Sequence, residues 1–282
     1  MISRLNRFSN LTQRVIAGLI GAILIISATY YSQWTYFIAF FVLCMMTMLE
    51  FYKLVGLDGI FPLKFWGTFT GMVLYTVTFL FMADYVTYHY LFIMFPLASL
   101  SFFIKLYKRS EKKPFTNIAF TFLGIMYVAV PFSLLHVCTL LGGEYSHQIV
   151  LGLMLIIWAS DTGAYFAGTN FGKTKLFERV SPKKSWEGSI GGAITAGLMV
   201  LAISYFYRDL NIWEWMIVGG ITVVTATYGD LVESLFKRSI AIKDSGTTIP
   251  GHGGFLDRFD GLLLSVPFIL VYLVFLHEVI NR

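Results

Sequence analysis

The stretch from Ser234 to Asp260 gathers the residue types that phosphate and metal chemistry require. It holds seven formally charged residues, although only 13% of the whole chain is charged. Three glycines surround His252, and glycine permits unusual backbone angles and a close approach to a ligand. Asp257 lies three residues before Asp260, so on a helical turn the two carboxylates share one face. Together these residues indicate a phosphate site that is built with a metal ion.

Three more acidic residues lie in or at the ends of apolar stretches upstream. Asp161 stands in IIWASDTGAYFAG, and Asp230 and Glu233 stand in TYGDLVESLFKR. Charged residues inside membrane helices are costly and mark functional positions, although a structural polar contact with a neighbouring helix is the alternative for each. Asp230 stands seven residues before Lys237, which is two helical turns along one face, so a carboxylate and a cation point the same way into the following loop.

A second basic cluster, SPKKSWEG, occupies residues 181–188. Pro182 predicts a turn, and Ser185 is placed to cap the helix that follows. A helix N-terminus with Lys183 and Lys184 beside it is a ready anion site. The alternative is that these lysines only follow the general excess of Lys and Arg in cytoplasmic loops.

The remainder of the chain is too apolar for an ordinary soluble domain, being 57% hydrophobic with a mean hydropathy of +0.71. A membrane helix needs about 20 mostly apolar residues. Glycines clustered at 67 and 71, and again at 188, 191 and 192, predict close helix packing. We therefore expect an all-α polytopic membrane protein with about nine transmembrane helices. They are expected near 15–31, 34–51, 65–83, 88–106, 115–141, 147–168, 188–206, 212–234 and 261–279.

The distribution of Lys and Arg tests this layout, because cytoplasmic loops collect basic residues. With the N-terminus inside, 19 of the 21 basic residues fall in the inner segments, and only Arg208 and Arg282 do not. The sequence therefore predicts a cytoplasmic N-terminus, an outer C-terminus and a retained first helix instead of a removed signal peptide. The net charge of +5 then reflects topology and attraction to anionic lipid, not nucleic-acid binding.

The charged C-terminal segment resembles the signature of phosphatidate cytidylyltransferases, also called CDP-diacylglycerol synthases. SPKKSWEG and the segment around Asp161 also resemble the middle region of that family. The resemblance is strong over roughly 155–260 and weak before it, where only the multi-span layout agrees. The signature residues are Ser234, Phe236, Lys237, Arg238, Lys243, Asp244, Gly246, Pro250, His252, Gly253, Gly254, Asp257, Arg258 and Asp260.

The resemblance implies a nucleotidyltransferase of phospholipid biosynthesis that makes CDP-diacylglycerol and pyrophosphate from CTP and phosphatidic acid with Mg²⁺. Attack of the lipid phosphate on the α-phosphorus of CTP would be in line, with catalysis by positioning and charge neutralisation. Whether one cation or two take part stays open. CTP is cytosolic and the lipid tails stay in the bilayer, so we expect the site at the cytoplasmic face of a multi-pass cell (inner) membrane protein.

The resemblance also implies roles for individual residues. Metal ligands are expected at Asp230, Asp257 and Asp260. Catalytic roles are expected for Lys243, Asp244, Asp257 and Asp260. Substrate and phosphate contacts are expected from Asp161, Lys183, Lys184, Ser185, Lys237, Arg238, His252, Gly253, Gly254 and Arg258. His252 has the least defined role, since it either contacts phosphate or only holds the glycine turn.

We expect one integral membrane domain over 1–282. It divides into N-terminal helices over 1–145 and a catalytic region over 146–282, with cytoplasmic loops at 169–187 and 235–260. A homodimer is compatible with this layout. The alternatives are another lipid-phosphate nucleotidyl or phosphoryl transferase and, in a different class, an ion-coupled transporter. A transporter would explain Asp161, but not the concentration of basic residues and GHGG in one loop.

Overall fold

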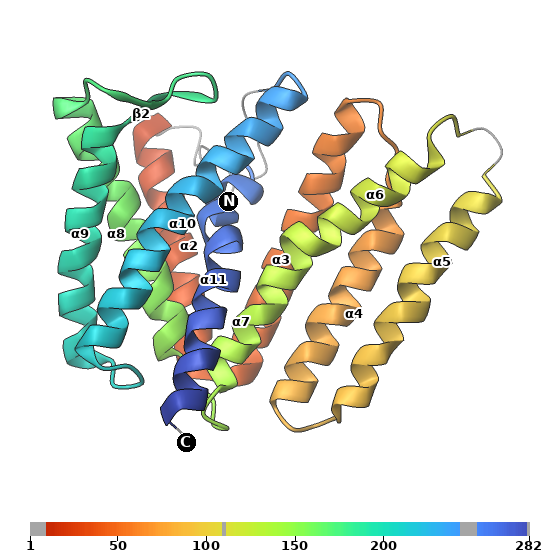
Figure 1. The fold of residues 1–282 in the computed structure, drawn as a ribbon, viewed down its shortest axis with the longest axis horizontal. Coiled ribbons are helices and arrows are strands. Elements are labelled where there is room, and N and C mark those ends of the chain that lie inside the picture. Colours follow the sequence, from red (N-terminus) through yellow and green to blue (C-terminus); the bar gives the residue numbers. More distant parts are fainter. Residues whose placement is uncertain (1–9, 109–110, 243–252, 281–282) are drawn as a thin grey trace.

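The computed structural model describes residues 10–108, 111–242 and 253–280, and within these ranges the side chains of residues 18–276. This part of the chain is almost entirely helical (Figure 1). A short antiparallel ribbon joins β1 (Lys175–Phe177) to β2 (Ser181–Ser185). The helices are α2 (Asn10–Tyr31), α3 (Gln33–Leu57), α4 (Lys64–Met82), η1 (Tyr88–Ile93), α5 (Met94–Leu106), α6 (Pro114–Gly124), η2 (Ile125–Ala129), α7 (Val130–Leu140), α8 (Gln148–Phe171), α9 (Trp186–Phe206), α10 (Ile212–Ser239) and α11 (Leu256–Ile280).

Eight helical segments among the described residues are long and apolar enough to cross a membrane. They correspond to α3, α4, η1 with α5, α6 to α7, α8, α9, α10 and α11. The first expected stretch, 15–31, lies in α2, whose described apolar part is the shorter segment Gly18–Tyr31. The structure thus confirms the all-α polytopic fold and gives each of the nine expected stretches a helix.

Local sequence explains where several helices begin. Ser32 and Thr35 form a capping box at the start of α3, and Asn211 and Glu214 form another at the start of α10. In each box a side-chain oxygen accepts from a backbone N–H that has no partner inside the helix. These caps lie in the short connections between apolar stretches, so they set the membrane helices apart without long loops.

The span from Pro114 to Leu140 contains a π-helical turn, η2, that the sequence analysis did not foresee. Pro131 follows this turn and has no backbone N–H to donate to the carbonyl four residues earlier, which belongs to Tyr127. A proline within a helix therefore accounts for the local widening, and π-helical turns are frequent near functional sites.

Glycines bring pairs of helices into close contact, as the sequence predicted. A Cβ added at Gly191 on α9 would lie 2.2 Å from Cβ of Ala167 on α8. A Cβ added at Gly67 on α4 would lie 2.3 Å from the hydroxyl oxygen of Tyr52 on α3. Because small residues let backbones approach in a membrane, these contacts fix α9 against α8 and α4 against α3.

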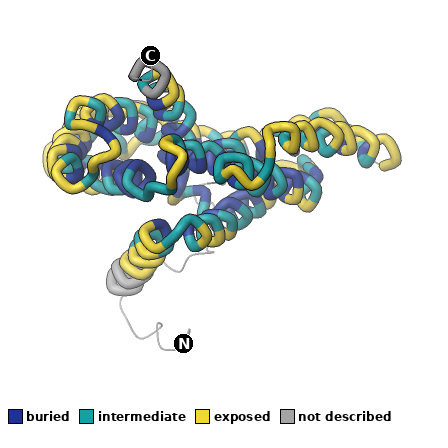
Figure 2. Tube along the Cα trace, turned by 90° about the horizontal axis from the view of Figure 1, so that it is seen from below, coloured by how far each residue is buried: buried dark blue, intermediate teal, exposed yellow. Residues whose placement is uncertain are grey.

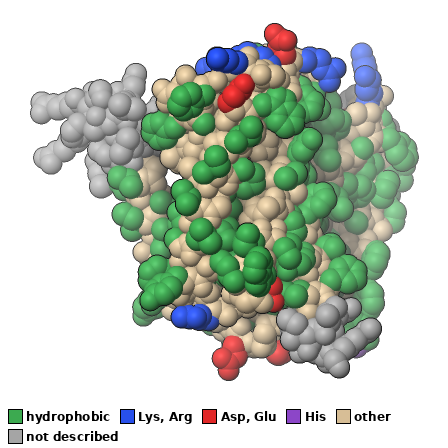
Figure 3. Space-filling view, turned by 60° about the vertical axis from the view of Figure 1, so that its left-hand side comes forward, with side chains coloured by type: hydrophobic (Ala, Val, Ile, Leu, Met, Phe, Trp, Pro, Cys, Tyr) green, Lys and Arg blue, Asp and Glu red, His purple; other side chains and the backbone are tan. Residues whose placement is uncertain are grey.

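The connections lie at two opposite ends of the bundle (Figure 1). The β1–β2 ribbon and the α3–α4 and α5–α6 connections are at one end, whereas the α4–α5, α7–α8 and α9–α10 connections and the C-terminus are at the other. Figure 2 shows buried residues concentrated where the helices meet and exposed residues on their outer sides. Figure 3 shows hydrophobic side chains over the middle of one face and charged side chains gathered at its two ends, as expected for a membrane protein.

Candidate active site

The crossing of α10 and α11 brings acidic residues from two helices together. A Cβ added at Gly229 would lie 2.5 Å from the backbone oxygen of Asp260 and 2.9 Å from Cα of Gly261. The two backbones can touch here only because these positions are glycine. Asp230 follows Gly229 in the chain, and Asp260 precedes Gly261. The close crossing of the two helices therefore places these two carboxylates side by side.

Three carboxylates form a compact group at this crossing. One oxygen each from Asp230, Glu233 and Asp260 lies within 4.8 Å of the others. The Glu233 side chain is only 1% exposed, and the backbone N–H of Gly261 donates to Asp260 Oδ1 over 2.6 Å. Like charges held this close repel one another unless a cation lies between them. Carboxylate oxygens in this arrangement are the donors that a hard divalent cation prefers.

Two lysines pair with the acidic residues at the site. Lys184 Nζ lies 2.6 Å from Asp230 Oδ2, and it comes from the SPKKSWEG cluster. Lys237 Nζ lies 2.5 Å from Glu233 Oε2 and 2.9 Å from Asp257 Oδ1. The residues expected to contact phosphate and those expected to bind metal are thus in direct contact with one another, which makes them one site.

A cavity of about 780 Å³ opens onto these side chains. The described residues that line it come from α8, β2, α9, α10 and α11, and they include five acidic and four basic side chains. The charged lining residues are Asp161, Lys183, Lys184, Asp230, Glu233, Lys237, Asp257, Arg258 and Asp260. A cavity of this size, with both signs of charge on its wall, suits a polyanionic ligand that arrives with a cation.

The SPKKSWEG cluster forms strand β2 and the first turn of α9. Pro182 does not make the expected turn; it lies in β2, which pairs with β1, and a two-stranded ribbon tolerates proline because each strand keeps a free edge. Ser185 caps α9 as predicted, since its Oγ accepts from the backbone N–H of Gly188 over 3.1 Å. Glu187 accepts from the backbone N–H groups of Lys173 and Thr174, which ties the ribbon to α9.

The glycines before α11 have two different functions. Gly253 has a φ of 81°, in the left-handed region that favours glycine. Gly254 has no such angle, but a Cβ there would lie 1.7 Å from Oε1 of Glu50 on α3. The unusual angle and the close approach were predicted from the sequence, but Glu50 was not. A carboxylate inside an apolar stretch is the signal that indicated Asp161, and the same signal applies to Glu50.

Several expected site residues lie elsewhere or outside the described residues. Arg238 is exposed, is not among the residues that line the cavity, and donates to the carbonyl of Ile242 over 3.2 Å. Arg258 is exposed and lines the cavity. Lys243, Asp244 and His252 fall outside the described residues, so their predicted roles stay predictions.

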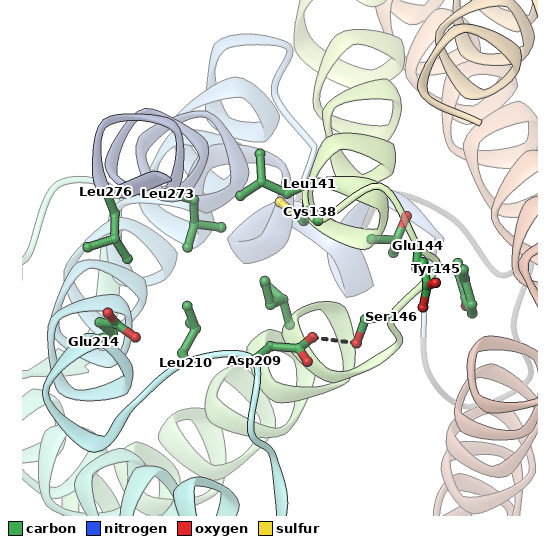
Figure 4. A pocket seen from close by; sticks show the side chains of 13 residues that line it. Cys138, Leu141, Glu144, Tyr145, Ser146, Asp209, Leu210, Glu214, Leu273 and Leu276 are labelled. Atoms are coloured by element: carbon green, nitrogen blue, oxygen red, sulfur yellow. Dashed lines mark hydrogen bonds between the residues drawn. The ribbon is translucent and has the colours of Figure 1, made fainter. Parts of the chain in front are cut away.

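Figure 4 shows a second cavity, of about 600 Å³. Its lining includes the α7–α8 and α9–α10 connections, which lie at the end of the bundle opposite the β1–β2 ribbon (Figure 1). Its acidic lining residues include Asp209 and Glu214. Ser146 donates to Asp209, and the backbone N–H of Asn211 donates to Glu214 over 2.6 Å in the cap of α10. These two carboxylates thus hold connections and helix ends in place, and no Lys or Arg is among the described residues that line this cavity.

Comparison with known proteins places the chain in a family. A family model described as the cytidylyltransferase family matches residues 12–276. A Haemophilus influenzae protein named phosphatidate cytidylyltransferase is 46% identical over 143 residues, which cover 47% of this chain and only 50% of that protein. Proteins of the same name from Staphylococcus aureus (strain COL) and Staphylococcus haemolyticus are 38% identical over 183 and 182 residues, or 63% of this chain and 68% of each of theirs. With a family match that extends over nearly the whole membrane bundle, this chain belongs to the cytidylyltransferase family.

Proposed function

We propose that this chain is a phosphatidate cytidylyltransferase, which converts CTP and phosphatidic acid to CDP-diacylglycerol and pyrophosphate. The names of the relatives support these substrates. The structural observation that carries the proposal is the cavity where the carboxylates of Asp230, Glu233 and Asp260 face Lys184 and Lys237. Charge of both signs is what a reaction between two phosphate-bearing substrates needs, because each substrate is an anion that repels the other.

In the proposed reaction, an oxygen of the lipid phosphate forms a bond to the α-phosphorus of CTP. The bond from that phosphorus to the oxygen that bridges to the β-phosphate breaks, and pyrophosphate leaves with the electron pair. The attacking oxygen is already anionic, so no strong general base is required. The protein must instead align two anions and neutralise their charge, and the cavity offers Lys183, Lys184, Lys237 and Arg258 for this purpose.

The donor set at the α10–α11 crossing fits Mg²⁺, which prefers carboxylate oxygens. Asp230, Glu233 and Asp260 would hold the ion, because one oxygen of each lies within 4.8 Å of the others. Asp257, expected earlier as a ligand, lies beside this group and shares Lys237 with Glu233. When bound, the ion would neutralise phosphate charge and orient the phosphate oxygens.

We place this site at the cytoplasmic face of the cell (inner) membrane, with the N-terminus inside and the C-terminus outside. The excess of Lys and Arg in the connections at the end of the bundle that carries the site supports this orientation. CTP is available in the cytosol, and the lipid substrate reaches the same end of the bundle from the bilayer. A homodimer and the lack of a nucleic-acid partner remain part of the proposal.

The proposal is tested with purified protein in mixed micelles that contain phosphatidic acid and CTP labelled in the cytidine. Label should appear in a lipid-extractable product only when phosphatidic acid and Mg²⁺ are both present, and chelation of the cation should abolish it. Product from another phospholipid instead would favour a different lipid-phosphate transferase. No lipid-linked label under any cation would overturn the proposal, and ion uptake by vesicles containing the protein would then favour a transporter.

A further inference from the structure

Glu50 is a buried carboxylate that lies far from the active-site residues in the sequence. It lies in the second half of α3 and is only 6% exposed. The burial of a carboxylate in an apolar bundle is unfavourable unless hydrogen bonds or opposite charge stabilise it. The partners of Glu50 therefore indicate why an acidic residue stands at this position.

The partners include the backbone at the start of α11. Glu50 Oε2 accepts from the N–H of Phe255 over 3.0 Å, and Oε1 accepts from the N–H of Leu256 over 3.2 Å. The first N–H groups of a helix have no partner inside it and carry a partial positive charge. Glu50 thus gives α11 an N-terminal cap from another helix, more than 200 residues away in the chain.

Asp257 lies immediately after these two residues and takes part in the same arrangement. Its Oδ2 accepts from the N–H of Gly254 over 3.3 Å, while its Oδ1 accepts from Lys237. Two carboxylates therefore bind three consecutive backbone amides, those of Gly254 to Leu256. Any shift of Glu50 would move this turn, and with it Asp257 and, one helical turn later, Asp260.

We propose that Glu50 is a positioning residue for the reaction, because its carboxylate fixes the start of α11 and so holds Asp257 and Asp260 in place against α10. The involvement of these aspartates in catalysis rests on the proposed function. The capping of α11 does not rest on the proposed function, since it follows from the hydrogen bonds of Glu50 with Phe255 and Leu256. The N-terminal helices thereby contribute directly to a site whose charged lining comes from α8 to α11.

The first test measures amide hydrogen exchange and turnover of Glu50→Gln in detergent, with Glu111→Gln as the control for a hydrogen-bonded carboxylate that does not line the cavity. Amide hydrogen exchange should accelerate at least about tenfold in a peptide covering 253–262 in the Glu50 variant, and not in the control. Turnover should fall about 10- to 100-fold, as for a residue that supports metal ligands, while KM for CTP changes less than about threefold. Unchanged exchange at 253–262, or equal turnover in the two variants, would overturn the proposal.

The second test uses Gly254, whose backbone angle places no demand for glycine. Gly254→Ala should lower turnover at least about tenfold in the native protein, because its Cβ would meet Glu50 Oε1. In a Glu50→Ala background the same change should lower it less than about threefold, since the obstructing carboxylate is absent. An equal effect in both backgrounds would show that the Glu50 contact does not explain this glycine, and would contradict the proposal.

These measurements separate the inference from the proposed function. If the native protein shows no transfer from CTP to phosphatidic acid, the function fails, but the exchange result still decides whether Glu50 caps α11. If Glu50→Gln does not fold, Glu50→Asp keeps the charge on a side chain that is one methylene shorter. In this variant the peptide 253–262 should exchange faster than in the native protein but more slowly than amides that have no hydrogen-bond acceptor. Exchange at the native rate would overturn the proposal.

Discussion

The active-site carboxylates and the ion pair of Lys105 with Glu111 both place charge in an apolar bundle, but they differ in how fully that charge is partnered. Lys105 is almost completely buried, and its Nζ donates to both carboxylate oxygens of Glu111 over 2.6 Å and to the carbonyl of Phe61 over 2.8 Å. Asn117 donates to Glu111 over 2.9 Å and accepts from the N–H of Phe61. All three ammonium donors of Lys105 are used, so this network is closed.

At the active site the charges remain open to a cavity. Asp230 keeps 44% of its side chain exposed although Lys184 lies 2.6 Å away, and three carboxylates crowd within 4.8 Å. Among the described residues that line the cavity, five side chains are acidic and four are basic. Crowded charge that faces a cavity can still act on a ligand and suits the proposed reaction, whereas the charges of Lys105 and Glu111 are saturated by each other and form a structural connection.

Asp260→Asn should cause a greater loss of activity than any other substitution considered for the two charged regions. Turnover should fall by about a thousandfold, or about 4 kcal/mol, because the change removes one carboxylate from the group that would hold the cation. The melting temperature should stay equal or rise, since a crowded negative charge has been removed. Radiometric turnover and thermal unfolding in the same detergent check both parts.

Asp209→Asn is the matched control, because this carboxylate lines the second cavity and is bonded to Ser146. Its turnover should remain within about twofold of the native value. A similar loss of activity in both variants, or a large fall in stability for Asp260→Asn, would mean that Asp260 supports the fold and that the open cluster is not the reactive one.

Glu111→Gln should show the opposite pattern, with a loss of stability and native turnover per folded molecule. Removal of one partner from a buried ion pair leaves Lys105 without its counter-charge and should lower the free energy of unfolding by about 3 kcal/mol. Reversible unfolding in mixed micelles measures this change. A loss of turnover at unchanged stability would show that the closed network belongs to the reaction.

The pH dependence of this network has a definite sign. Burial raises the pKa of Glu111, but hydrogen bonds from Lys105 and Asn117 outweigh it, so the pKa lies below its ordinary value. A carboxyl group whose pKa is lowered by folding stabilises the folded protein at pH values above its pKa in the unfolded state, which is about 4.3 for Glu. That stabilisation is lost as the pH falls through the pKa of the group in the folded state. The stability difference between the native protein and Glu111→Gln should therefore shrink as the medium is acidified below that range.

The sequence predicted the local features and the close packing at glycine clusters, but not which side chains the helix crossings bring together. The span expected at 147–168 is the helix Gln148–Phe171, because apolar length is a property of one segment. The cap at Ser185 followed from its neighbours in the same way. Pairing with β1 overrode the turn propensity of Pro182, and no local pattern could pair Lys184 with Asp230.

The acidic cluster itself was predicted only in part for the same reason. Asp230 and Asp260 were expected as ligands from the resemblance, but Glu233 joins them because two glycines let α10 and α11 touch. Glu50 lies more than 200 residues before its partner amides, so the contact follows from the fold and not from spacing. The predicted roles of Lys243, Asp244 and His252 stay predictions, since these residues lie outside the part of the chain that the structure describes.

Gly229→Ala should lower turnover less than Asp260→Asn does. It tests whether the crossing of α10 and α11 brings the carboxylates of Asp230 and Asp260 together. The added Cβ would meet backbone atoms of Asp260 and Gly261, which cannot rotate away as a side chain can. Overpacking of this kind should lower stability by about 1–3 kcal/mol, and separation of Asp230 from Asp260 should lower turnover about tenfold.

Gly220→Ala provides the control on the same helix, because an added Cβ there has no atom within 4 Å among the described residues. It should be neutral or slightly stabilising, since alanine has the higher helix propensity. If both variants lose activity equally, the effect belongs to α10 as a whole and not to its contact with α11.

Tyr127→Phe should change stability only slightly. The hydroxyl of Tyr127 is buried in the π-helical turn and has no hydrogen-bond partner among the described residues. This hydroxyl lies near the carboxylates of Asp260 and Glu233. Tyr127→Phe removes a donor that is not in use, and the free energy of unfolding should stay constant or rise by up to about 1 kcal/mol. Thermal unfolding of the two proteins in one detergent measures the difference.

Tyr52→Phe gives the matched comparison, because the hydroxyl of Tyr52 donates to the carbonyl of Thr121 over 2.6 Å. Loss of this bond should lower the free energy of unfolding by about 1 kcal/mol, so the two substitutions should differ in sign. A destabilised Tyr127→Phe would mean that its hydroxyl is already satisfied in the folded protein. The cluster beside it would then be as closed as the one around Lys105, and the distinction between reactive and structural charge would have to rest on the cavity alone.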